Sequence, residues 1–177
     1  KWFSGTRPTE FEDYKSLTGE NGTIQVGMTD IDPPFSYQDD DVLTGFDLEY
    51  IILFAREYGY KLELNTVDFS FILGSVQTGK YDLALGGITI TDERKEVLNF
   101  TDTYYRSPVV MVTKGYDSEK TYLADLSGKK IGVMTGSIQA VMMPELVPDA
   151  EYMEFNSISD LIAALNSKKI DAFGCDE

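Results

Sequence analysis

Hydrophobic and polar positions along the first half of the chain alternate with two different periods, which predict a succession of strands and helices. The segment 61–67 alternates strictly, as a half-buried strand does. Apolar residues in 46–58 recur near helical spacing, and Gly59 follows as a stop signal. Together the patterns predict strands at 23–29, 61–67 and 81–85 and helices at 46–58 and 69–78. Alternating strands and helices indicate a parallel α/β layer.

The same order returns in the second half. Strands are predicted at 130–133, 151–155 and 170–174, with helices at 137–143 and 159–166. Segments 68–84 and 157–173 also align with their apolar positions in register. The matching polar positions are Ser70 with Ser159, Lys80 with Lys169, and Asp82 with Asp171. We expect two similar α/β lobes, and true internal duplication stays open.

The segment between the two halves, 100–114, is rich in tyrosine and β-branched residues, which favours an extended strand crossing from one lobe to the other. We therefore expect a tail or linker at 1–21, a first lobe at 22–104 and a second lobe at 105–177. Architectures of this kind bind small molecules between the lobes, facing the carboxyl ends of the strands.

Composition narrows the possible functions. The 177 residues carry a formal net charge of -15, which disfavours nucleic acid and anionic membrane surfaces as partners. The chain has no histidine, so it lacks the commonest general base and zinc ligand. The single Cys175 is expected to be a small buried strand residue. The acidic run 39–41 favours a solvated turn over a calcium loop because its spacing is wrong for calcium. We predict no metal and no cofactor.

The run 86–105, GGITITDERKEVLNFTDTYY, holds the most chemical information. Thr91 is suited to cap a short helix, and Arg94 then stands just past a strand end that carries Gly87 and Thr89. A guanidinium there could bind a carboxylate through two parallel hydrogen bonds. The alternative from spacing alone is that Arg94 pairs with Asp92, Glu93 or another surface acid.

These motifs resemble those of the bacterial extracellular solute-binding proteins of family 3. GITITDER followed by NFTDTYY is similar to the family signature, and PPFSY, TGFDLEY, VDFS and KIGVMTGS follow the family order. The glutamine-binding type is especially similar. The resemblance implies a two-lobed type II periplasmic-binding fold, each lobe a mostly parallel sheet with flanking helices. It also implies a monomeric extracytoplasmic receptor that delivers a free amino acid to an ABC transporter permease.

The resemblance further implies a role for individual residues. Arg94 matches the residue that binds the ligand α-carboxylate, and Asp176 matches the one that receives the α-ammonium. The other matching positions are Thr89 and Gly87 beside Arg94, Ser137 and the backbone of Ile138 at a helix start, Phe69 in the side-chain pocket, and Asp30. For Phe69 the alternative is core packing, and for Asp176 it is an exposed acid. A bidentate cation, a carboxylate and an apolar wall together suit a zwitterion.

The sequence also departs from the family pattern. Asp32 stands where many relatives carry an aromatic residue, and Met134 stands where the glutamine-binding type has a polar one, which puts a glutamine ligand in doubt. The chain stops one residue after Asp176, so we expect an incomplete second lobe and a piece of something longer. Residues 1–5, KWFSG, resemble the usual ending of such domains and suggest a preceding tandem copy.

Two other functions stay open. The domain could be the ligand sensor of a membrane-bound signalling receptor, with a signalling module of the same chain as its partner, because sensors use the same hinge closure. More remotely, it could be an enzyme resembling cyclohexadienyl dehydratases. That enzyme would need a buried general acid, for which Asp32 and Asp176 are the candidates.

Overall fold

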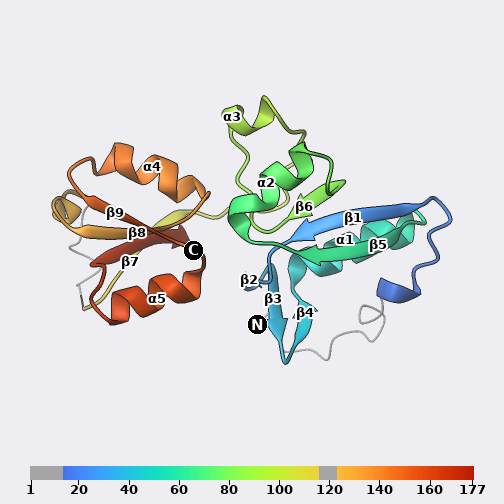
Figure 1. Ribbon diagram of the computed structural model, residues 1–177, viewed down its shortest axis with the longest axis horizontal. Coiled ribbons are helices and arrows are strands. Elements are labelled where there is room, and N and C mark those ends of the chain that lie inside the picture. The colour runs from blue at the N-terminus through green and yellow to red at the C-terminus, as the bar shows by residue number, and fades with distance from the viewer. Residues whose placement is uncertain (1–13, 116–122) are drawn as a thin grey trace. The chain divides into compact units, whose positions relative to one another are not determined.

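The computed structural model describes residues 14–115 and 123–177. The chain divides into two compact units, Lys1–Ile88 and Thr89–Glu177, which are described separately (Figure 1). The KWFSG segment lies outside the described residues. The expected lobe bounds, 22–104 and 105–177, stay predictions.

The first unit is built on a parallel sheet with the strand order β5-β1-β6. Two helices pack on this sheet, and a 3-10 turn at Tyr14–Ser16 precedes it. The elements are β1 (Thr23–Met28), α1 (Phe46–Glu57), β5 (Lys61–Thr66), α2 (Phe69–Gln77) and β6 (Leu83–Leu85). The predicted elements are thus present, although β6 is two residues shorter than expected.

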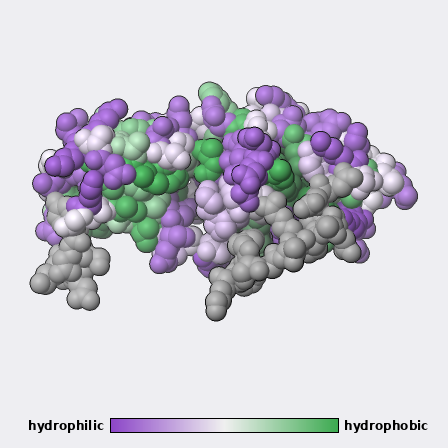
Figure 2. Space-filling model, turned by 90° about the horizontal axis from the view of Figure 1, so that it is seen from below, coloured by the Kyte–Doolittle hydropathy of each residue, from purple (hydrophilic) through white to green (hydrophobic). Residues whose placement is uncertain are grey.

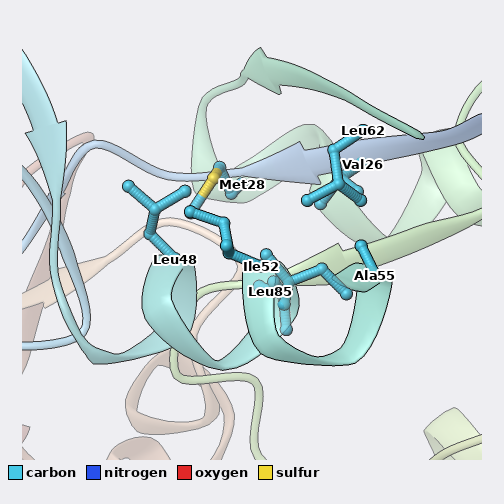
Figure 3. Packing of buried hydrophobic residues seen from close by; sticks show 8 residues of the cluster. Val26, Met28, Leu48, Ile52, Ala55, Leu62 and Leu85 are labelled. Atoms are coloured by element: carbon cyan, nitrogen blue, oxygen red, sulfur yellow. The ribbon is translucent and has the colours of Figure 1, made fainter. Parts of the chain in front are cut away.

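Successive side chains of β1 point to opposite faces of this sheet. Val26 and Met28 are fully buried and belong to one cluster with Ile52 of α1, as Figure 3 shows. On the other face, a Cβ built on Gly27 would overlap the ring of Tyr81. A side chain at position 27 would therefore displace this buried tyrosine.

A small antiparallel sheet, which the hydrophobic pattern did not predict, follows β1. It consists of β2 (Ile31–Asp32), β3 (Ser36–Asp39) and β4 (Val42–Thr44). The two residues between β3 and β4, Asp40 and Asp41, have φ values of 48° and 62°. Positive φ at both central residues is the geometry of a tight hairpin turn, which aspartate tolerates. The acidic run thus forms a turn, as predicted.

The second unit contains a four-stranded sheet with the order β7-β10-β8-β9, in which only β7 runs antiparallel to its neighbour. Its elements are α3 (Asp92–Lys95), β7 (Val109–Thr113), a 3-10 turn (Leu123–Leu126), β8 (Lys130–Met134), α4 (Ile138–Leu146), β9 (Glu151–Phe155), α5 (Ile158–Asn166) and β10 (Ala172–Asp176).

Helices α4 and α5 cover opposite faces of this sheet, which Figure 1 shows on either side of it. Neighbouring residues of β10 point to different faces. Ala172 therefore packs in the cluster that contains Met143 of α4, whereas Phe173 packs in the cluster that contains Leu161 of α5. Cys175 packs at the edge of the second cluster and is half-buried rather than fully buried.

Two elements of this unit have other bounds than predicted. Strand β10 both begins and ends two residues later than expected. Ile170, which is 2% exposed, packs against Gly132 although it precedes the strand, because burial of an apolar residue does not require strand structure. Helix α4 continues through Pro144 instead of ending at Met143. The Tyr152 hydroxyl lies 2.6 and 2.8 Å from the carbonyl oxygens of Met143 and Val147, so the last turn keeps hydrogen-bond partners.

No helix in the described ranges, 14–115 and 123–177, combines the length and the apolar character that crossing a membrane requires. Hydrophilic residues occupy much of the face drawn in Figure 2, and apolar patches lie between them.

Candidate functional site

Three of the predicted binding residues lie at one edge of the first unit. Strands β5, β1 and β6 are parallel and in register, with Met28 paired to both Thr66 and Leu85. Asp30, Phe69 and Gly87 follow these strands within three residues, so they gather at the carboxyl edge of the sheet. Open α/β sheets bind their ligands at this edge.

Local contacts fix the chain around Asp30 and Gly87. The Asp30 carboxylate accepts a 3.3 Å hydrogen bond from Gln38 Nε2. The main-chain carbonyl of Asp30 accepts a hydrogen bond from the Gln38 N–H. Gly87 has a φ of 61°, which glycine adopts readily, and a Cβ there would stand 2.9 Å from Asp32 Oδ2. The Asp32 carboxylate therefore lies directly against the backbone of Gly87.

Phe69 begins α2 and is 8% exposed. It lies outside the three large apolar clusters among the described residues. The burial of Phe69 is consistent with both expectations, that it lines a ligand pocket and that it packs in the core.

In the second unit, short helix α3 positions Arg94. As predicted, Thr91 caps this helix, and its hydroxyl accepts a 3.1 Å hydrogen bond from the Arg94 N–H. The guanidinium donates from Nη1 to the carbonyl of Thr89 at 2.7 Å and from Nη2 to the carbonyl of Gly136 at 3.0 Å. Two of the five guanidinium N–H donors are thus used for orientation. Within residues 14–115 and 123–177, the guanidinium thus bonds to backbone carbonyls and not to a surface acid.

The electrostatic surroundings of Arg94 reflect its partial burial. Loss of solvent lowers the pKa of the guanidinium from its usual value, and neighbouring Glu93 opposes this shift. The group stays charged at physiological pH because the usual pKa of arginine lies far above that pH. A half-buried cation attracts an anion more strongly than a fully solvated one does.

Ser137 is the N-cap of α4 and is 3% exposed. Its hydroxyl accepts a 3.3 Å hydrogen bond from the Ala140 N–H. Ile138 follows as the first helical residue, so its N–H belongs to the helix start, where an anion is favoured. Gly136, whose carbonyl binds Arg94, directly precedes this cap.

Asp176 ends strand β10, and the structure adds a residue that the sequence analysis missed. Gln139, on α4, donates a 2.9 Å hydrogen bond from Nε2 to Asp176 Oδ1. Partial burial raises the pKa of the Asp176 carboxyl, and the bond from Gln139 opposes the rise. Glutamine is an ordinary helix residue, and its partner lies 37 positions away, so no local pattern indicated this contact.

Two groups of residues thus exist, one in each unit. Asp30, Phe69 and Gly87 share the carboxyl edge of the first sheet. In the second unit, Arg94 is joined to Thr89 and to the residue before Ser137, and Asp176 is joined to the same helix through Gln139. The second unit by itself carries a cation, a helix start and a carboxylate. A few such polar groups on an α/β scaffold are typical of proteins that bind small molecules.

The family-level comparison agrees with this class. Residues 24–142 match the model of the bacterial extracellular solute-binding proteins, family 3, and the chain belongs to this family. The arginine-binding extracellular protein ArtP of Bacillus subtilis is 38% identical over 141 residues, which cover 78% of this chain and 55% of ArtP. The chain spans about half the length of the curated relatives that it matches.

Solved structures give the same result. An ancestral arginine-binding protein bound to arginine is 35% identical with a TM-score of 0.81, covering 88% of this chain and 70% of that one. An ancestral amino-acid-binding protein, a precursor of cyclohexadienyl dehydratase, is 30% identical with a TM-score of 0.82, covering 89% and 71%. The predicted family and the type II periplasmic-binding fold are therefore confirmed.

Proposed function

We propose that this protein binds a free amino acid outside the cytoplasm, without catalysis, and delivers it to an ABC-type importer. The observation that carries this proposal is the Arg94 guanidinium, which two backbone carbonyls orient while it keeps N–H donors for a carboxylate. Asp176 supplies a negative charge for the ligand ammonium, and Ser137 and Ile138 supply the helix start.

The carboxyl edge of the first unit's sheet also gathers predicted binding residues, and its charge favours one class of ligand side chain. Asp30 and Asp32 place two carboxylates there, and the contact between Asp32 and Gly87 holds one of them beside the backbone. Carboxylates favour a cationic side chain over an apolar one. Relatives named for arginine binding support arginine as the first ligand to try.

The test is a thermal-shift panel of the twenty amino acids on the full-length protein, followed by calorimetry of any hit. A ligand at about 100 times its Kd should stabilise the folded protein by about 2.7 kcal/mol. Arg94→Ala should abolish the shift because the ligand carboxylate loses its counter-charge. Lys95→Ala is the matched control, since Lys95 is the next cation on α3 and pairs with Asp92 at the surface.

Failure of every amino acid to stabilise the full-length wild type would overturn the proposal. A ligand that binds Arg94→Ala as tightly as wild type would overturn the assignment of Arg94 alone. The sensor alternative uses the same binding step, so this panel tests the step that both functions share.

A further inference from the structure

Gln139 occupies an unusual place for a polar side chain. It lies on α4 two residues after the N-cap and is only 5% exposed. A buried amide costs free energy unless it is hydrogen-bonded. The bond that compensates this cost is the one from Nε2 to Asp176 Oδ1, which joins α4 to the end of β10.

The surroundings hold Gln139 in this orientation. A Cβ built on Gly174 of β10 would lie 3.5 Å from both Cβ and Cγ of Gln139, so the strand backbone lies close alongside the glutamine stem. Ser137 fixes the start of α4 two residues earlier. A rigid strand and a capped helix therefore determine where the amide group lies.

We propose that Gln139 is a positioning residue for amino-acid binding: it fixes the Asp176 carboxylate so that Oδ2 faces the ligand ammonium. This inference rests on the proposed function. With Oδ1 committed to Gln139 Nε2, Oδ2 is the carboxylate oxygen left to accept from the ligand. An ammonium group, which carries three donors, suits such an acceptor.

The chemistry explains why a glutamine serves here. A carboxylate at a strand end can rotate about its side-chain torsions, and each rotamer that points away from the ligand weakens binding. A neutral amide donor restricts the carboxylate without cancelling its charge. A lysine or arginine at the same place would neutralise Asp176 and repel the ligand ammonium.

The test measures two properties of Gln139→Met and Gln139→Asn in the full-length protein. Methionine keeps the length but cannot donate, and asparagine keeps the amide but is one methylene shorter. We expect both variants to bind L-arginine, or the amino acid that the panel identifies, about tenfold or more weakly than wild type. We also expect ¹³C NMR titration to show a higher Asp176 pKa, because the carboxylate loses a donor.

Gln25→Met is the matched control. It removes a glutamine donor to another carboxylate, Glu63, on strands β1 and β5 of the first unit. It should leave both the Kd and the Asp176 pKa unchanged.

The outcomes separate this inference from the proposed function. Unchanged affinity in both Gln139 variants would overturn the inference, and so would weaker binding with an unchanged Asp176 pKa. If the wild type binds no amino acid, the proposed function fails, and the Asp176 titration still tests whether Gln139 controls the carboxylate.

Discussion

Asp82 in the first unit and Asp171 in the second make the same pair of hydrogen bonds to the strand beside them. The Asp82 carboxylate accepts from the Gln25 N–H at 2.7 Å, and the Asp82 N–H donates to the Gln25 carbonyl at 2.9 Å. The corresponding distances between Asp171 and Lys130 are 2.9 and 2.7 Å. At Asp82 and Asp171, the alignment of 68–84 with 157–173 therefore corresponds to the same local contact in the structure.

Replacing either aspartate by alanine should destabilise its unit. Asp82→Ala and Asp171→Ala each remove the acceptor of a strand N–H, so we expect a loss of about 1 kcal/mol of unfolding free energy. Urea unfolding of the full-length protein measures the change. Asp149→Ala, at an exposed acid, should fall within about 0.5 kcal/mol of wild type. If the three variants are indistinguishable, the reciprocal pairs contribute nothing measurable.

Periodicity predicted most of the fold because long amphipathic segments leave a strong pattern. Helix α1 and strand β8 fall within a residue of their predicted bounds. The small antiparallel sheet left no such signal, since its strands are two to four residues long and Pro33 and Pro34 interrupt them. Ile170 shows a different limit, because an apolar position identifies the core but not whether the residue is in a strand.

The candidate site could be predicted only as far as family motifs reach. Arg94 with its Thr91 cap follows from the GITITDER motif, and the structure shows both in place. The carbonyl of Gly136 and the amide of Gln139 were not predictable because both contacts join residues 37 or more positions apart. Such contacts depend on how the chain folds, which no local pattern in one sequence records.

Gly132 should not tolerate a methyl group. A Cβ there would lie 2.5 Å from Leu161 Cδ2 and 2.6 Å from Ile170 Cδ1, both fully or almost fully buried. Overpacking of this kind costs about 1–3 kcal/mol, so Gly132→Ala should lower the urea midpoint. Gly74→Ala is the control, because the new Cβ meets nothing within 4 Å on helix α2 and should stabilise by about 0.5–1 kcal/mol. Equal stability of the two variants would show that the core around Gly132 relaxes freely.

Asp176 should make both stability and ligand binding depend on pH. Burial raises its pKa in the folded protein above the value near 4 of an unfolded chain. Protonated Asp176 therefore contributes fully to the stability of the folded protein below about pH 4. This contribution is lost as the pH rises through the pKa of Asp176 in the folded state. Without ligand, Asp176→Asn should be more stable than wild type at neutral pH, and this gain should disappear below about pH 4.

Amino-acid binding should show the opposite trend, because the ammonium requires an ionised Asp176. Affinity should fall on acidification at a pH above the usual aspartate range, since the pKa of this carboxyl is raised. Calorimetric titrations between about pH 3 and 8, paired with urea unfolding over the same range, measure both effects. Asp171→Asn is the comparison, because Asp171 is an exposed acid bound to a strand N–H in the same unit. If affinity stays constant down to pH 4, or falls identically in Asp176→Asn, then Asp176 is not the group that receives the ammonium.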